Sequence, residues 1–474
     1  MMHYFSLVLA VCCSFFTTGI YSQSLVQISG QLEDIHSEPI MLAYYLGDKQ
    51  YIEDTVEIDA NGKFIFTYPE LLEQGVYLFY FPGNSRYVEF ILGDDQQFSV
   101  KGKLSDFTKT AKFSGSTDNT LFYGYLNKLE TFKEKDEKWS AVKSRHTLNG
   151  NADSLKVADE MIQQNGDAYK VYKKQFLEKN ANSFLEKLLR FNERPDVPET
   201  LTQEEKYYYY KNHIFDNLDW SFDGVLRSPN YESLLTEFID KLTPQTPDSI
   251  IIACDLILQK TKENDDLFKY TLIQLTNKYA RSTTICFDAI YVHLVENYYL
   301  KGQAFWLNGT DEESKVQLKK MKENAERLKP VLCGNYAYNF TLADEKGKKH
   351  ELRKISGERT ILLFWASDCH RCEAFMKELA AITDLCEKKG VTIVSVDNGA
   401  DGKLWREKLE KYPVKNMLAL TSSGSEEQTL LIEQFDLYST PLAFFLDKDK
   451  KILYKKLDVE QIKNIVERLP DVSE

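Results

Sequence analysis

The sequence has little of what several classes of protein require. Basic residues are in deficit, because 59 Lys and Arg stand against 72 Asp and Glu and give a net charge of -13. This balance argues against a general surface for nucleic acid or for anionic membranes, since both need a basic patch. Low-complexity tracts are absent and 43% of the residues are hydrophobic, so most of the chain is expected to fold. At this length we expect about two to four domains.

Long apolar runs are also absent beyond the first residues. Residues 1–22 contain no Asp, Glu, Lys or Arg, and the apolar run within them is too short to span a bilayer. We therefore predict a secretory signal peptide at 1–22, and with it a periplasmic or cell-envelope location. Lipidation at Cys12 or Cys13 is the weaker alternative, because Val11 is bulky where a small residue is usual. Membrane contact is expected only in that case.

Cysteine is scarce as well. Six cysteines follow the predicted leader, too few for a fold built on disulfides in a chain of this length. Two of them, Cys369 and Cys372, are separated by only two residues. The others are expected to be buried, unreactive thiols, and spacing alone leaves a Cys254–Cys286 bond open. These others are Cys254, Cys286, Cys333 and Cys386. No metal site is expected, because structural zinc needs four ligands and no second Cys-x-x-Cys or Cys-x-x-His pair is present.

Between the leader and residue 330, the sequence pattern changes once, from strand-like to helical. Residues 23–116 contain short runs of aromatic and β-branched residues punctuated by glycine, which predicts an antiparallel β-sandwich. Asn61 and Gly62 before an alternating run predict a hairpin turn. From 117 to 330 apolar residues recur at helical spacing, which predicts an all-α domain. The aromatic tract Tyr207–Tyr210 is expected to pack in its core, and a binding groove is the alternative.

Strand and helix patterns alternate from residue 331 to 474, which predicts an α/β domain with a mixed sheet. An opening hairpin is expected around the turn at 345–347. The strands that follow are expected at 361–366, 391–396, 417–420, 442–446 and 452–455. The helices are expected from the dithiol to about residue 389 and at 402–411, 426–435 and 458–468.

A buried strand that delivers two cysteines to the start of a helix is the most informative pattern in the chain. Apolar and aromatic residues fill 361–366, as in a central strand covered on both faces. Apolar residues recur at helical spacing after Cys372. Two cysteines placed this way can form a small disulfide ring, and the helix N-terminus favours the thiolate of the first, Cys369.

Three short segments carry a resemblance to a known family. They are Phe364-Trp365-Ala366, Cys369-His370-Arg371-Cys372 and Ser439-Thr440-Pro441. Together they resemble the thioredoxin fold, in particular the periplasmic TlpA/ResA-like branch of the thioredoxin-like superfamily, over residues 331–474. The whole layout resembles multidomain thioredoxin-like chains of Bacteroidetes. The resemblance implies a cis-proline at Pro441 opposite the cysteines, a Thr440 backbone free to pair with an extended substrate, and a substrate contact at Trp365.

The sequence departs from the family at the positions that usually move the proton of the second cysteine. Thioredoxin has a buried aspartate six residues before the first cysteine, where this chain has Leu363. The TlpA/ResA-like pattern has a glutamate three residues after the second cysteine, where this chain has Phe375. Asp368 also replaces the usual tryptophan before Cys369. Water, Asp368 and Glu373 are therefore three open candidates for accepting the proton of the second thiol.

The dithiol predicts a thiol–disulfide oxidoreductase whose only redox group is its own Cys369–Cys372 disulfide, with no further cofactor. Cys369 attacks a client disulfide as the thiolate, and Cys372 resolves the mixed disulfide. The hypothesis for activation is that His370 and Arg371 lower the pKa of Cys369, while Asp368 acts in the opposite direction. Because thioredoxin has Gly-Pro between its cysteines, the resemblance implies a weaker reductant here.

The direction of electron flow is not encoded in these residues. The resemblance favours a reductant of client proteins with disulfides, recharged by a membrane thiol–disulfide electron donor, and isomerase or oxidase roles stay open. One alternative is an envelope binding protein in which the β and helical domains capture a client and the dithiol is secondary. Another is a peroxiredoxin, which needs a threonine where this chain has Ala366.

Overall fold

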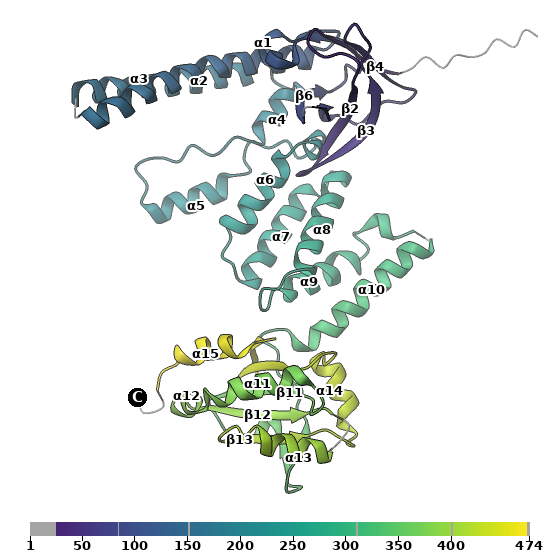
Figure 1. The fold of residues 1–474 in the computed structure, drawn as a ribbon, viewed down its shortest axis with the longest axis vertical. Helices are drawn as coiled ribbons and strands as arrows, with labels where there is room; N and C mark the ends of the chain where they lie inside the picture. The colour runs from purple at the N-terminus through teal and green to yellow at the C-terminus, as the bar shows by residue number, and fades with distance from the viewer. Residues whose placement is uncertain (1–24, 84, 150–151, 310, 400–401, 472–474) are drawn as a thin grey trace, which may run out of the picture. The chain divides into compact units, whose positions relative to one another are not determined.

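The computed structural model describes residues 25–83, 85–149, 152–309, 311–399 and 402–471 (Figure 1). The predicted signal peptide, with Cys12 and Cys13, lies outside the described residues. Contacts within the chain divide it into two compact units, Met1–Glu237 and Phe238–Glu474. The predicted helical segment 117–330 is therefore shared between the two units. In the described part of the chain, no helix combines the length and the apolar character needed to span a bilayer.

The first unit begins with two four-stranded sheets that enclose one core. The strands are β1 (Val26–Leu32), β2 (Pro39–Leu46), β3 (Lys49–Glu57), β4 (Lys63–Tyr68), β5 (Gly75–Phe81), β6 (Arg86–Leu92), β7 (Gln97–Gly102) and β8 (Lys112–Ser114). The sheet orders are β4-β1-β7-β8 and β3-β2-β5-β6. Inward residues of both sheets form one aromatic-rich cluster that includes Ile28, Phe79 and Phe90, so the region is a sandwich as predicted.

Two details of the sandwich differ from the sequence prediction. Strands β1 and β7 pair in parallel, so the sandwich is not wholly antiparallel. The predicted hairpin turn at Asn61 and Gly62 is a turn, with Gly62 at a φ of +75° that only glycine adopts freely. It does not join paired strands, because β3 pairs with β2 while β4 pairs with β1. The turn therefore connects the two sheets.

The first unit also contains helices, of which α1 lies between β7 and β8 and the others follow the sandwich. They are α1 (Phe107–Thr110), α2 (Thr117–Asn149), α3 (Ala152–Lys179), α4 (Phe184–Arg190), α5 (Gln203–His213) and α6 (Asn230–Thr236). Helices α2 and α3 lie side by side (Figure 1). The buried Asn165 of α3 donates to the Phe132 carbonyl at 2.8 Å and to the Asp136 carboxylate at 2.7 Å, both on α2. This buried polar contact favours one register of the pair.

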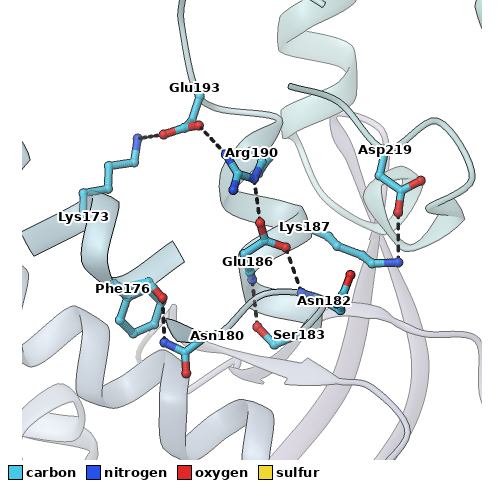
Figure 2. Close-up of polar contacts among 10 residues, drawn as sticks. All are labelled: Lys173, Phe176, Asn180, Asn182, Ser183, Glu186, Lys187, Arg190, Glu193 and Asp219. Carbon is cyan, nitrogen blue, oxygen red and sulfur yellow. Dashed lines mark hydrogen bonds and ion pairs between the residues drawn. The ribbon is translucent and has the colours of Figure 1, made fainter. Parts of the chain in front are cut away.

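A polar network holds α4 against the end of α3 (Figure 2). The Glu186 carboxylate accepts from Arg190 Nε at 2.6 Å and from the backbone N–H of Asn182 at 3.3 Å. Arg190 also donates to Glu193 at 3.3 Å, and Glu193 pairs with Lys173 of α3 at 3.5 Å. Each carboxylate is shared by two donors, so these half-buried charges compensate one another and the network is structural.

The aromatic tract on α5 is not a core element. Helix α5 buries none of its residues, and the side chains of Tyr207 and Tyr208 are 36% and 54% exposed. The prediction that Tyr207–Tyr210 pack in the core is therefore wrong for these two residues. Consecutive tyrosines point around all sides of a helix, so they give no single apolar stripe that a core could cover.

The second unit begins with a helical region. Its helices are α7 (Pro247–Thr261), α8 (Asp265–Ala280), α9 (Asp288–Leu294) and α10 (Glu312–Leu328). Thr246 caps α7, Asn264 caps α8 and Asp311 caps α10, in each case by accepting from a backbone N–H three residues on.

A seven-stranded mixed sheet with helices forms the rest of this unit. The strands are β9 (Thr341–Asp344), β10 (Lys349–Glu351), β11 (Arg359–Trp365), β12 (Val391–Asp397), β13 (Met417–Thr421), β14 (Leu442–Asp447) and β15 (Ile452–Lys455). The helices are α11 (His370–Ala380), α12 (Thr383–Lys388), α13 (Gly402–Lys411), α14 (Glu427–Phe435) and α15 (Val459–Glu467). The order is β10-β9-β13-β12-β11-β14-β15, with β11 parallel to β12 and antiparallel to β14. The predicted fold class, a β-sandwich, a helical region and an α/β domain, is confirmed.

Among the contacts that join the helical region of the second unit to its α/β region are a disulfide and two ion pairs. Cys286, just before α9, is disulfide-bonded to Cys333, 47 residues later. Lys455 of β15, 3% exposed, pairs with Asp288 of α9. Arg327 of α10 pairs with Asp436 after α14. The bond at Cys286 answers the question that spacing left open, because Cys254 is a free, buried thiol and is not the partner.

Candidate active site at the start of α11

The dithiol is placed by the central strand β11. Alternate residues of this strand enter different cores: Ile361, Leu363 and Trp365 pack on one side of the sheet, and Leu362 and Phe364 on the other. A strand buried on both faces is rigid, because neither side chain set is free to move into solvent. The turn that follows β11 therefore presents the cysteines from a fixed base.

The two cysteines occupy unlike environments. Cys369 is the N-cap of α11, and its sulfur accepts from the backbone N–H of Cys372 at 3.3 Å. It is partly exposed, whereas Cys372 is fully buried at 0% exposure. Both are free thiols in this structure. Only the first sulfur is therefore accessible from solvent.

The environments separate the pKa values of the two thiols. Partial burial raises the pKa of Cys369, but hydrogen bonds from the Cys372 thiol, the Thr440 side chain and the backbone N–H groups of Cys372 and Arg371 outweigh it and lower the pKa overall. Burial raises the pKa of Cys372 to about 12, and the contact with Cys369 adds to the rise. At neutral pH the exposed thiol is thus the better nucleophile and the buried thiol keeps its proton.

The loop before β14 lies against the exposed sulfur. The Thr440–Pro441 peptide bond is cis, as the resemblance implies. The Thr440 carbonyl oxygen lies 3.5 Å from Cys369 Sγ, at hydrogen-bond distance for a thiol. The backbone of Thr440 is therefore next to the position that a client sulfur would occupy.

The remaining predicted site residues take different positions. Asp368, His370 and Arg371 are exposed on the turn and the first turn of α11. The hydrogen bonds that lower the pKa of Cys369 include the backbone N–H of Arg371, while a contribution from the side-chain charges of these three residues stays a prediction.

Trp365 is 1% exposed and belongs to the core beneath the dithiol. The predicted substrate contact at Trp365 is therefore corrected: the ring supports the turn from below.

Glu373 is unsuited to accept the proton of the second thiol. Its carboxylate binds the ammonium group of Lys408 and accepts from Tyr412 Oη at 2.6 Å. The contact with Lys408, followed by that with Tyr412, lowers the pKa of Glu373 to about 2. A carboxylate this acidic stays ionised at neutral pH and takes up a proton poorly.

Asp397, a buried carboxylate beside the turn, was not predicted from the sequence. Asp397 ends β12 opposite Trp365 and is 0% exposed. Its Oδ1 accepts from the backbone N–H of Ser367 at 2.9 Å, and its Oδ2 is buried without a hydrogen-bond partner. Burial, together with the charge of Asp368, raises the pKa of Asp397 to about 6. The available signal was its place at the carboxyl end of a strand parallel to β11, since such ends meet at one edge of a sheet.

Comparison with known proteins agrees with this geometry. Residues 333–455 match the AhpC/TSA family. The thiol-disulfide oxidoreductase ResA of Bacillus thuringiensis subsp. konkukian is 28% identical over 134 residues, which cover 28% of this chain and 74% of the relative. The ResA of Geobacillus thermodenitrificans is also 28% identical, over 29% of this chain and 79% of the relative. These matches support a thioredoxin-like domain at residues 333–455 that is similar to the ResA proteins.

The thioredoxin-like domain is accordingly an oxidoreductase domain. A crystal structure of a thioredoxin-like protein from Bacteroides caccae covers 58% of this chain and 97% of its own, with 20% identity and a TM-score of 0.42. The preceding regions match two families of unknown function, DUF4369 at residues 26–122 and DUF5106 at residues 160–328.

Proposed function

We propose that this protein is a thiol–disulfide oxidoreductase of the cell envelope that reduces disulfides in client proteins through Cys369 and Cys372. One observation carries the proposal: a partly exposed thiol with a lowered pKa lies at a helix N-terminus beside a buried thiol with a raised pKa. This difference suits a reaction in which Cys369 attacks first as a thiolate and Cys372 stays protonated until it resolves the mixed disulfide.

The reaction proceeds in two exchanges. The Cys369 thiolate attacks one sulfur of the client disulfide, and the second client sulfur leaves as a thiolate that takes a proton from water. Cys372 then loses its proton and attacks Cys369 Sγ, which releases the first client sulfur. The client gains two electrons and two protons, and the protein is left with a Cys369–Cys372 disulfide. A membrane thiol–disulfide donor is the proposed source of the electrons that restore the dithiol.

An envelope location is supported by the second cysteine pair. Cys286 and Cys333 are bonded, and structural disulfides persist in oxidising compartments such as the periplasm. The predicted signal peptide at 1–22 supports the same location. No nucleic-acid partner is proposed.

A binding role for the first two thirds of the chain is the second candidate function. Exposed aromatic rings on α5, Tyr207 and Tyr208, favour it, because large apolar surfaces on a helix are common at recognition sites. In this case the thioredoxin-like domain would serve a client that the other regions capture. A peroxiredoxin function is disfavoured by the methyl group of Ala366 at the position where that chemistry uses a hydroxyl.

Trapping with Cys372→Ser in cells tests the proposed function. Without the resolving sulfur, mixed disulfides between Cys369 and its clients should accumulate and disappear on reduction. Cys254→Ala is the matched control, since this free thiol is buried in α7 and does not belong to the dithiol, and it should trap nothing. Adducts that persist in the double variant Cys369→Ser/Cys372→Ser would show that another sulfur forms them and would contradict the proposal.

A further inference from the structure

The loop that joins α14 to β14 carries an exposed ring two residues before Thr440, whose carbonyl oxygen contacts the reactive sulfur. The loop begins at Asp436, which ends α14 with a φ of +56°. Tyr438 follows and is 69% exposed, as exposed as any large hydrophobic side chain in the described part of the chain. Thr440, whose carbonyl oxygen lies 3.5 Å from Cys369 Sγ, is two residues further on. Two residues span at most about 7 Å, so the ring of Tyr438 is within reach of a peptide seated at Thr440.

A residue from outside the thioredoxin-like domain holds this loop. Arg327 is on α10, within the segment that matches DUF5106. Its Nη1 contacts Asp436 Oδ1 at 2.5 Å, and its Nη2 donates to Asn324 Oδ1 at 2.6 Å. The guanidinium carbon lies 5.5 Å from the centroid of the Tyr438 ring. One planar cation therefore engages both the carboxylate that starts the loop and the aromatic ring within it.

The surroundings of Asp436 explain why the contact with Arg327 stabilises the conformation of the loop. The Asp436 side chain is 5% exposed. Besides Arg327, Lys456 lies 3.8 Å from it, and the charge of the buried Lys455 also interacts with it. A nearly buried carboxylate needs compensation, so removal of Arg327 takes away its hydrogen-bonded cation and leaves the longer-range charges of Lys456 and Lys455. The loop is then free to change its backbone conformation. The left-handed conformation of Asp436 adds to this, because a residue other than glycine holds it only while its surroundings do.

We propose that Tyr438 binds a large apolar or aromatic client residue beside the cysteine under attack, and that Arg327 is the positioning residue that holds Tyr438 in place. This inference rests on the proposed function and narrows its substrate class to extended peptides with such a residue. Pairing of the client backbone at Thr440 brings the neighbouring client side chains over the loop. An exposed phenol ring offers them a rigid apolar surface. The helical region thus contributes to client selection through one side chain.

The test compares two disulfide-linked peptides in steady-state reduction by the full-length protein. One peptide has phenylalanine beside its cysteine and the other has serine. The wild type should prefer the phenylalanine peptide by about fivefold in kcat/KM, through a lower KM, as expected for one aromatic pair. Tyr438→Ala and Arg327→Ala should each remove most of this preference. Tyr438→Phe should keep it, while Arg327→Lys should not, because an ammonium group lacks the planar fork.

The matched control is Lys329→Ala, which removes a neighbouring cation whose partner is Glu296 and should keep the preference. Retained preference in Tyr438→Ala or in Arg327→Ala would overturn the inference, as would a wild type without preference. Exchange with the disulfide of 2-mercaptoethanol separates the two proposals. A wild type that reduces neither this compound nor the peptides contradicts the proposed function itself, whereas exchange without preference contradicts only the inference about Tyr438 and Arg327.

Discussion

The two cysteine pairs of the second unit differ in every property that governs reactivity. Cys369 and Cys372 are three positions apart, lie at a helix N-terminus and are free thiols. Cys286 and Cys333 are 47 positions apart, lie outside regular helices and strands, and are bonded. Spacing alone identified the first pair and missed the second. Short spacing reflects a local geometry that the chain dictates, whereas the distant pair exists only because the helical region packs on the sheet.

The largest expected effect separates the chemical roles of the pairs. Cys369→Ser should lower the rate of disulfide reduction by more than about 100-fold, because the attacking sulfur is lost and a serine hydroxyl is not ionised at neutral pH. The double variant Cys286→Ser/Cys333→Ser should keep most of the rate. The measurement is reduction of a disulfide-linked peptide under identical conditions. Comparable losses in both variants would remove the distinction between a reactive and a structural pair.

The second effect concerns stability. Loss of the Cys286–Cys333 bond, which closes a loop with a sequence separation of 47 residues, should lower the free energy of unfolding by up to about 4 kcal/mol. For a unit of this size the unfolding temperature should fall by roughly 10 °C. Differential scanning calorimetry of the double variant gives the value. Wild-type protein treated with a reductant should fall to the same temperature, and an unchanged unfolding temperature would exclude a stabilising role.

The third effect comes from the buried carboxylate beneath the dithiol turn. Burial raises the pKa of Asp397 from 3.8 to about 6 in the folded protein. Because the pKa of Asp397 is higher in the folded than in the unfolded protein, the folded state favours the protonated carboxyl group. The free energy of unfolding therefore decreases as the pH rises from about 4 to about 6 and the group loses its proton. The full cost at neutral pH is about 3 kcal/mol at most.

Asp397→Asn should therefore gain stability relative to the wild type as the pH rises from about 4 to about 7. The amide oxygen can still accept from the N–H of Ser367. Urea unfolding at both pH values measures the difference. Asp384→Asn is the control, because this side chain is 85% exposed and should show no such trend. Parallel curves for wild type and Asp397→Asn would mean that the carboxyl group is not titrating in this range.

The smallest effect tests which group helps the second thiol. Glu373 is held ionised by Lys408 and Tyr412, so Glu373→Gln should change the rate of resolution by less than about twofold. Quenched-flow measurement of the decay of the mixed disulfide gives this rate. A loss of tenfold or more would return Glu373 to the role of proton acceptor, and water or Asp368 would then no longer be needed.

The order of elements in the C-terminal domain was predictable from local pattern. Strand β11 and helix α13, for example, lie at or within two residues of the expected bounds. Buried strands and amphipathic helices can be predicted in this way because their apolar residues follow a characteristic spacing. The proposed attacking and resolving roles of Cys369 and Cys372 were also predictable from their positions. Trp365 was placed wrongly, because its aromatic character fits both a client contact and a core.

What the sequence did not yield depends on distant pairs. Asp397 becomes significant only when β12 lies beside β11, and Arg327 only when α10 reaches the end of α14. The exposure of Tyr207 and Tyr208 likewise depends on which surfaces the tertiary fold leaves open. The spacing of apolar residues predicts which face of a helix or strand is buried. It does not predict which residues of distant elements will come into contact.

The bond between Cys286 and Cys333 has a consequence for proteolysis. It closes a covalent ring that contains the whole of α10. One cut by a protease within this ring, at any exposed lysine of the helix, leaves both fragments attached to each other. They would migrate as a single species on a gel until a reductant separates them, so a nicked molecule keeps its oxidoreductase domain tethered to the rest of the chain.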